Sequence, residues 1–476
     1  MNPSKAIFIL LVVGGVLFLG CSDDDSDKSA PIDTDTNEDA GIDSGGDTDT
    51  DTDTDTDTSI ITEEGEMPTD LPSSCVAEVV QEAASEDDDW ASPGDGDGRR
   101  PDIDADESAL MVWSHRAPDA GSVWTIQAAA YDPGPEEGDG GTSDMDGGVR
   151  AIGTVENPAA SDVVSVDPAL AARGKEFGIV WRDGRWDPTC DGSDVDGCRK
   201  DLAFIRVDSN GQPIDSPNPI QITLDATVVM RPAIVATTTG YIVAWFEQVD
   251  FEDVLMALHL DEAGSPGTPQ RISTEEQGVY TKSPPGLAAI GDDAVVAWAT
   301  PKQRTILSRA LNGNAEPQGE SQLVAKGSLC LPPRIAAGDD SFMMTWSMQP
   351  QNDIEVFARK FNKDGSPAGE PQQVTWTISD VTHSDIAWNG SSFAFSWLSS
   401  TANGEDDCVV ESCDGQVFAA LLDLDGKVSS DSVILSKDPN DATQLVLAWD
   451  GSGWTAVYEL PRLNRQQAFY GRMTCD

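Results

Sequence analysis

Two stretches that each contain a pair of cysteines carry the residue types that could do chemistry. The first, RDGRWDPTCDGSDVDGC (182–198), presents Arg182, Arg185 and Trp186 beside a group of aspartates. A tryptophan among charged residues suits contact with a sugar or a peptide, because its ring offers an apolar face and a polar N–H. Arg182, Arg185 and Trp186 are therefore candidate ligand-binding residues.

Asp191, Asp194 and Asp196 of the same stretch are oxygen ligands of the kind that Ca²⁺ prefers. Their spacing departs from that of an EF-hand loop. Two interpretations stay open: a calcium site, which is the one cofactor that the sequence suggests, or a solvated acidic loop held by its disulfide.

The second stretch, TANGEDDCVVESC (401–413), adds Asp406, Asp407 and Glu411 to the candidate ligand-binding residues. The chain has no HExxH, GxSxG, Walker or protein-kinase motif. Carboxylates are abundant, so a glycosidase pair remains an alternative, but nothing singles out two of them. We therefore designate no catalytic residue, and we interpret His383 as a packing or rim residue.

From about residue 100 the chain repeats itself, and the repeat must position these stretches. PAIVATTTGYIVAW (232–245) is echoed by PGLAAIGDDAVVAW (285–298) and PRIAAGDDSFMMTW (333–346), each with Trp thirteen positions after Pro. Seven such units are present. Their key aromatic residues are Trp113, Trp181, Trp245, Trp298, Trp346, Trp397 and Tyr458.

Each unit predicts four antiparallel strands. A short apolar strand follows the Pro, turn residues such as GDD follow it, and a second apolar strand ends at the aromatic residue. A third strand and a Gly-containing turn lead to a short fourth strand such as PIQIT (219–223). In the unit that ends at Trp245, the second strand is GYIVAW (240–245). It is apolar on both faces, which predicts that it is covered on both sides.

Seven units of four strands resemble a seven-bladed β-propeller, an all-β fold in which sheets stack around an axis. The resemblance implies that the key aromatic residues pack between blades and that ligands bind on one face or at the central channel. It also implies that an N-terminal strand, CVAEVV (75–80), completes the last blade. Cys75 would then lie beside Cys475.

Eight cysteines fit an oxidising compartment. We expect disulfides between Cys75 and Cys475, between Cys190 and Cys198, and between Cys408 and Cys413, with Cys330 unpaired. A metal site is the alternative, but no Cys–His cluster supports it.

The N-terminal residues predict export. An apolar run from Ala6 to Gly20 is too short to span a bilayer and fits a cleaved signal peptide. LFLGC (17–21) resembles a bacterial lipobox, which implies lipidation of Cys21 and, with Ser22 next, an outer-membrane location. We therefore expect a signal peptide over 1–20, a disordered Asp/Thr-rich linker over 21–72 and the propeller over 73–476.

The chain has 84 acidic and 29 basic residues and a formal net charge of −55, which argues against nucleic acid as a partner. We expect a monomer that meets the membrane only through its lipid, in the cell envelope and facing the periplasm or the cell surface. The first hypothesis is a propeller scaffold that binds a protein, glycan or cation. The alternatives are an extracellular hydrolase acting on polysaccharide or peptide, and a structural envelope component.

Overall fold

The computed structural model describes residues 71–78, 97–106, 108–116, 124–132, 148–155, 164–187, 190, 199–224, 228–274, 277–327, 331–349, 353–377, 380–399, 415–436, 442–462 and 465–476. The chain divides into two compact units, 1–58 and 59–476, and every described residue belongs to the second. The predicted signal peptide, Cys21 and the linker up to residue 70 lie outside the described residues. The described part contains no helix with the length and apolarity of a membrane span.

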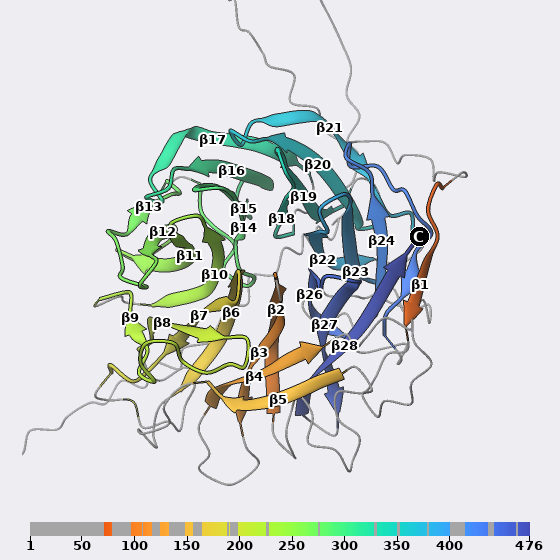
Figure 1. The fold of residues 1–476 in the computed structure, drawn as a ribbon. Helices are drawn as coiled ribbons and strands as arrows, with labels where there is room; N and C mark the ends of the chain where they lie inside the picture. Colours follow the sequence, from red (N-terminus) through yellow and green to blue (C-terminus); the bar gives the residue numbers. More distant parts are fainter. Residues whose placement is uncertain are drawn as a thin grey trace, which may run out of the picture. The chain divides into compact units, whose positions relative to one another are not determined.

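The described strands form seven four-stranded antiparallel sheets, which confirms the seven-bladed β-propeller. Figure 1 shows the sheets around a common centre, with the first strand of each blade innermost. Blades 1 to 3 contain β2 (Asp97–Ala105), β3 (Ala109–Arg116), β4 (Trp124–Asp132), β5 (Gly148–Thr154); β6 (Ser165–Arg173), β7 (Glu176–Asp183), β8 (Asp201–Asp208), β9 (Ile220–Gln221); and β10 (Val229–Thr237), β11 (Gly240–Val249), β12 (Glu252–Asp261), β13 (Gln270–Arg271).

The remaining blades follow the same order along the chain. Blades 4 to 6 contain β14 (Gly286–Ile290), β15 (Asp293–Thr300), β16 (Thr305–Leu311), β17 (Pro317–Lys326); β18 (Arg334–Ala337), β19 (Ser341–Met348), β20 (Glu355–Asn362), β21 (Pro367–Gln373); and β22 (Val381–Trp388), β23 (Phe393–Ser399), β24 (Gln416–Leu422), β25 (Val433–Ile434). Blade 7 contains β26 (Thr443–Trp449), β27 (Trp454–Arg462), β28 (Arg465–Cys475) and, as its outer strand, β1 (Cys75–Glu78).

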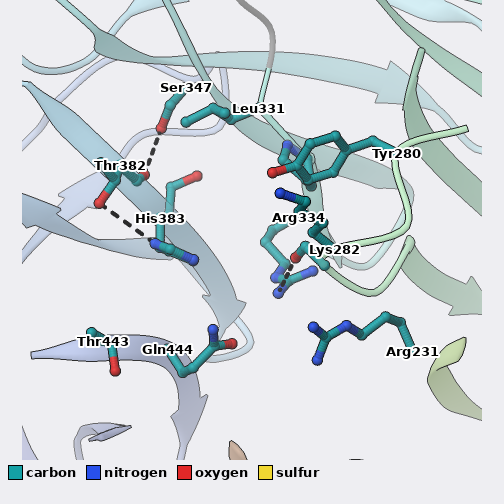
Figure 2. Close-up of a pocket in the computed structure, with 13 residues that line it drawn as sticks. Arg231, Tyr280, Lys282, Leu331, Arg334, Ser347, Thr382, His383, Thr443 and Gln444 are labelled. Atoms are coloured by element: carbon teal, nitrogen blue, oxygen red, sulfur yellow. Dashed lines mark hydrogen bonds between the residues drawn. The ribbon is translucent and has the colours of Figure 1, made fainter. Parts of the chain in front are cut away.

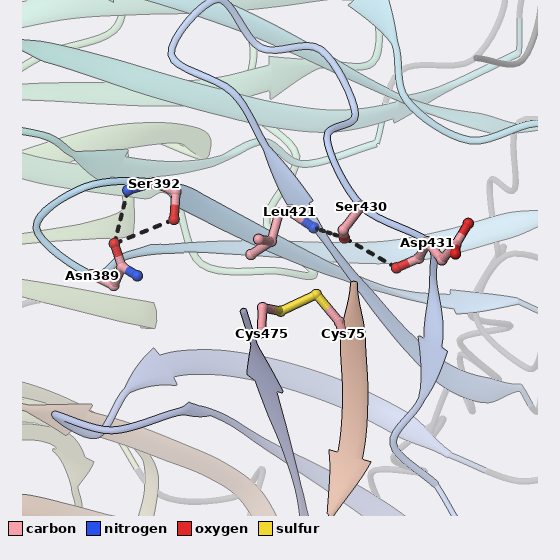
Figure 3. The surroundings of a disulfide bond; sticks show 7 residues. All are labelled: Cys75, Asn389, Ser392, Leu421, Ser430, Asp431 and Cys475. Atoms are coloured by element: carbon pink, nitrogen blue, oxygen red, sulfur yellow. Dashed lines mark hydrogen bonds between the residues drawn. A yellow bond between two sulfur atoms is a disulfide. The ribbon is translucent and has the colours of Figure 1, made fainter. Parts of the chain in front are cut away.

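Strand β1 closes the ring as the sequence predicts. It pairs antiparallel with β28, with Cys75 opposite Cys475, and a disulfide joins the two. Figure 3 shows this bond between the start of β1 and the end of β28. The predicted Cys75–Cys475 disulfide is therefore confirmed, and it links residues 400 positions apart.

Both faces of each second strand are buried, and GYIVAW shows how. Tyr241, Val243 and Trp245 pack against blade 2, in a cluster that includes Val180 and Phe204. The alternate residues Ile242, Ala244 and Phe246 pack against blade 4 in a cluster with Val296 and Trp298. Side chains alternate between the faces of a strand, so a strand between two blades must be apolar throughout.

The key aromatic residues occupy one equivalent place in all seven blades. Each lies in a buried cluster with residues of the preceding blade, and each is at most 5% exposed: Trp113, Trp181, Trp245, Trp298, Trp346, Trp397 and Tyr458. The predicted packing role of these residues is confirmed.

Hydroxyl side chains extend the pairing between the third and fourth strands in four of the blades. Hydroxyl groups at the end of the fourth strand accept a backbone N–H from the third strand, as Thr223 does from Leu202 at 2.9 Å and Thr375 from Val356 at 2.8 Å. Ser273 and Ser436 do the same for Leu255 and Val417. The Thr or Ser that ends PIQIT, PQRIS, PQQVT and SVILS therefore accepts a third-strand N–H that the fourth strand leaves unpaired.

Antiparallel pairing places two kinds of connection on the same face of the propeller. These are the turns between second and third strands and the connections from one blade to the next. We call this the mouth face. The predicted ligand-binding stretches, between β7 and β8 and between β23 and β24, both begin on it.

Candidate functional site

The described candidate residues of the first stretch contact the blade and are partly exposed. Arg182 is part of β7 and donates to Asp167 at 2.5 Å. Arg185 donates to Asp183, whose side chain is fully buried, and its guanidinium lies 5.7 Å from the centre of the Trp186 ring. Trp186 itself packs against the cluster between blades 1 and 2.

Asp183 organises the start of this stretch. Its carboxylate accepts from the Trp181 indole N–H at 2.6 Å, from the Ser165 hydroxyl at 3.2 Å and from the backbone N–H of Arg185 at 2.8 Å. Such a set of donors holds the turn after β7 in one conformation. Arg182, Arg185 and Trp186 are each partly exposed, so their predicted ligand contacts stay a prediction.

Several candidate residues lie outside the described part of the chain, so their predictions stand untested. Cys190 is disulfide-bonded, but its predicted partner Cys198 is among the undescribed residues. The rest of this set is Asp191, Asp194, Asp196, Cys330, Asp406, Asp407, Cys408, Glu411 and Cys413. No group of three or more His, Cys, Asp or Glu that could hold a metal ion occurs among the residues that the structure describes.

Aspartates on the first strands join neighbouring blades along the channel. Asp102 accepts the backbone N–H of Leu170 at 2.6 Å, and Asp104 accepts that of Ala172 at 2.8 Å. Asp106, directly after β2, accepts the backbone N–H of Gly174 at 2.8 Å. These N–H groups belong to β6 and the turn after it, and β6 is the inner edge strand of blade 2. The alternating aspartates of DIDAD (102–106) therefore satisfy an edge that would otherwise lack partners.

Blade 6 uses the same device, since Asp385 accepts the backbone N–H of Leu447 at 2.7 Å. Burial raises the pKa of Asp102 to about 8 and the pKa of Asp104 to about 6. Burial also raises the pKa of Asp385 to about 6, against the opposing effect of the Arg334 charge. These channel carboxyls are thus held by the backbone of a neighbouring blade.

The Asp167 carboxylate, at the channel, is surrounded by three arginines. Asp167 forms ion pairs with Arg100 and with Arg182, and the Arg231 guanidinium approaches it to 3.8 Å. Burial opposes the charge on Asp167, but Arg100 and Arg182 outweigh burial and hold the pKa of Asp167 below its usual range. Three guanidinium groups around one carboxylate leave this side of the channel with excess positive charge.

A cavity of about 240 Å³ lies at the mouth of the channel. We call it the mouth cavity. Blades 3 to 7 and the connections between them contribute its lining: Arg231, Tyr280, Lys282, Ser283, Leu331, Pro332, Arg334, Ser347, Thr382, His383, Ser384, Thr443 and Gln444. Figure 2 shows the guanidinium groups of Arg231 and Arg334 and the amide of Gln444 facing one open space, with the His383 ring across from them.

The charged side chains of the mouth cavity are partly held in place. Arg334 donates to the backbone carbonyl of Pro284 at 3.1 Å and to the Ser283 hydroxyl at 3.3 Å, and its Nε lies 3.7 Å from Asp385. His383 has its Nδ1 3.5 Å from the Thr382 hydroxyl. Burial, together with the charge of Arg334, lowers the pKa of His383 to about 4. The prediction that His383 is a rim residue agrees with this position at the cavity wall.

A local backbone feature aims several of these side chains at the channel. Arg100, Asp167, Arg231 and Gln444 have φ between 49° and 57°, in the left-handed region. Each lies at a register shift in the pairing of the first two strands. A bulge of this kind turns a side chain away from the regular alternation of the strand.

The sequence interpretation missed this set of residues, although a signal for it exists. Arg100, Asp167 and Arg231 each directly precede the Pro of their repeat unit, and His383 and Gln444 occupy the same position in units 6 and 7. The same position is Pro284 in unit 4 and Pro332 in unit 5, so it is polar in five of the seven units. A polar position beside an apolar repeat is a candidate for function.

No family model matches the chain, and no curated protein sequence matches it. Solved structures are similar in fold. The parainfluenza virus 5 hemagglutinin-neuraminidase, solved with the ligand DANA, is 10% identical with a TM-score of 0.41, and the match covers 66% of this chain and 90% of that one. A Trypanosoma rangeli sialidase is 10% identical with a TM-score of 0.38, over 79% of this chain and 55% of the sialidase.

Two further similarities come from other kinds of enzyme. A prolyl endopeptidase structure is 12% identical with a TM-score of 0.42, over 79% of this chain and 47% of the peptidase. A GH43_1 enzyme from Xanthomonas citri is 12% identical with a TM-score of 0.33, over 57% of this chain and 90% of the enzyme. The chain therefore spans about half the length of the peptidase and of the Trypanosoma sialidase. These likenesses concern the propeller fold alone.

Proposed function

We propose that this protein is a binding scaffold of the cell envelope, whose propeller presents a ligand site at the channel mouth. The observation that carries the proposal is the mouth cavity, in which polar side chains from several blades face one space. A concave site with a few convergent polar groups is the usual form of a small-ligand site.

The engagement of the channel carboxyls favours binding over hydrolysis. A glycosidase needs two carboxyl groups that face the substrate, one of them as a proton donor. Asp102, Asp104 and Asp385 instead accept backbone N–H groups of the next blade. If any of these carboxyls turned towards a substrate, a backbone N–H of the next blade would lose its acceptor. Their role is therefore to join neighbouring blades.

The envelope location is part of the same proposal. LFLGC supports lipidation at Cys21, and the acidic linker after it supports a domain held away from the membrane. Labelling with a fatty-acid analogue in a bacterial host, compared between the wild type and Cys21→Ala, tests the anchor. Label on the Cys21→Ala protein would contradict lipidation at this residue.

A bulky substitution in the mouth cavity tests the binding site independently of the charge of the ligand. Ser283→Trp places a large ring at the wall of the mouth cavity, and Ser265→Trp places the same ring on an exposed turn between β12 and β13. Both variants and the wild type are screened against arrays of soluble glycans and peptides, with hydrolysis followed in parallel. We expect ligand binding that Ser283→Trp abolishes and Ser265→Trp retains, without turnover.

Two results would contradict the proposal. The first is hydrolysis of an array member by the wild type that a single substitution of Asp102 or Asp385 abolishes, because that would make the channel carboxyls catalytic. The second is a bound ligand that the Ser283→Trp variant retains with unchanged affinity, because the mouth cavity would then not be its site.

A further inference from the structure

We propose that the mouth cavity binds an oxyanion, that is, a carboxylate, sulfate or phosphate group of a small ligand. The inference rests on the proposed function, since it names the ligand class of the same site.

The charge of the cavity is opposite to that of the chain. Arg231, Lys282 and Arg334 line it, and its described lining residues include no Asp or Glu. The whole chain has 84 acidic residues against 29 basic ones. Three cationic side chains around one concave space, in so acidic a protein, concentrate positive potential at a single place.

The neighbouring carboxylates leave the charges of Arg231 and Arg334 incompletely paired. The nearest approach of Arg231 to Asp167 is 3.8 Å, and that of Arg334 to Asp385 is 3.7 Å. Both distances exceed those of a charge-assisted hydrogen bond, and Asp167 already accepts from Arg100 and Arg182. A guanidinium group has five N–H donors in a fork that fits an oxyanion, and Arg334 uses one nitrogen on the Pro284 carbonyl and one on Ser283.

Uncharged polar groups also line the cavity, among them the Tyr280 hydroxyl and the Gln444 amide. The hydroxyl groups of Ser384 and Thr443 donate to Thr345 and Glu459, so towards a ligand they can only accept. In Figure 2 the Gln444 amide faces the same space as the two guanidinium groups. Hydroxyl and amide groups can bind the polar body of a ligand whose charged group lies on the arginines.

Size limits the ligand to a small molecule or to the end of a larger one. The volume of about 240 Å³ equals the liquid volume of about eight water molecules at roughly 30 Å³ each. One sugar ring with a single acidic group is of this order. A free inorganic oxyanion would fit together with several waters.

His383 offers a direct reporter of the site. Burial and the charge of Arg334 lower its pKa to about 4 in the empty cavity. An anion beside Arg334 compensates that charge and favours the imidazolium, so the pKa of His383 should rise when the site is filled. His115 and His259 lie on β3 and β12 and serve as internal controls.

The experiment uses the purified full chain and three probes: sulfate, D-glucuronate and the neutral sugar D-glucose. Calorimetry gives the affinity of each probe, and NMR titration of the histidine side chains gives their pKa values with and without probe. The variants are Arg231→Ala and, as a charge-matched control, Lys326→Ala on the exposed end of β17.

We expect sulfate or glucuronate to bind, glucose not to bind, and the pKa of His383 alone to rise. Arg231→Ala should weaken anion binding about tenfold, the scale of one charge-assisted contact, whereas Lys326→Ala should not weaken it. Tighter binding of glucuronate than of sulfate would assign the oxyanion to a sugar acid, and the reverse order to an inorganic ion.

Three results would overturn the inference. They are binding of glucose as tight as that of glucuronate, anion binding that leaves the pKa of His383 unchanged, and the absence of any anion binding. If the Ser283→Trp variant still abolishes binding of an uncharged array ligand, the proposed function survives and only the ligand class is wrong. If no array ligand depends on the mouth cavity either, both proposals fail.

Discussion

Asp102 shows at the scale of one residue how the channel uses its carboxyl groups. It accepts the Leu170 N–H across the gap between blades, and burial raises its pKa to about 8. Between its ordinary pKa and this value the folded protein retains a proton that the unfolded chain has lost. Asp102 therefore makes the folded state less stable as the pH rises from about 4 to about 8.

Asp102→Asn should remove this pH dependence, because the asparagine amide is neutral and its oxygen can still accept the Leu170 N–H. We expect the variant to be about 4–6 kcal/mol more stable than the wild type near pH 9 and equal to it near pH 4, by urea unfolding. Asp106→Asn, at the exposed end of the same row, is the control. A variant that loses more stability near pH 9 than near pH 4 would show that Asp102 needs its charge.

Trp245 represents the other kind of residue, one whose role is packing alone. It is fully buried between blades 2 and 3, and its indole N–H donates to Glu247 at 2.9 Å. We expect Trp245→Ala to lower the free energy of unfolding by about 3–5 kcal/mol and to leave the affinity of the mouth cavity unchanged in the folded fraction. Trp245→Phe is the milder control. Lost binding at an unchanged melting temperature would refute the packing role.

At the scale of elements, the repeat made the strands predictable from the sequence. A run apolar at every position, such as GYIVAW, bounded by turn residues, can only be a strand covered on both faces, and β11 confirms this. The resemblance to a propeller also predicted that β1 completes blade 7, and the pairing of β1 with β28 confirms it. Local patterns were sufficient here because every blade repeats the same burial.

The site was predicted far less well, for a physical reason. The mouth cavity joins Arg231 of blade 3, Arg334 of blade 5 and Gln444 of blade 7, which are brought together only by closure of the ring. The local sequence around each of these residues therefore does not predict that they line one cavity. Arg185 and Trp186, which the sequence predicted as ligand contacts, lie against Asp183 and the blade and stay partly exposed, so that prediction is still open to test.

At the scale of the whole molecule, the ring depends on one non-local closure. Strand β1 has four residues, pairs only with β28 and is joined to it by the Cys75–Cys475 disulfide. A covalent link across 400 residues restricts the unfolded chain strongly, and the native sheet already holds the two cysteines opposite each other.

Removing this link should therefore destabilise the protein without changing its fold. We expect the double variant Cys75→Ser, Cys475→Ser to lose about 3–5 kcal/mol in denaturant unfolding, with an unchanged circular dichroism spectrum. The unreduced wild type should yield a peptide linked through Cys75 and Cys475 in mass spectrometry. Equal stability of variant and wild type would show that β1 pairing alone closes the ring.

The whole ring also creates the contrast on which the function depends, an anion-attracting mouth on an acidic chain. The most direct measurement is an anomalous difference map of crystals soaked in selenate, an oxyanion whose heavy atom identifies its own position. The account predicts a peak in the mouth cavity within hydrogen-bond reach of Arg231 and Arg334. Selenate bound elsewhere on the protein, with the mouth cavity empty and accessible to solvent in the crystal, would contradict it.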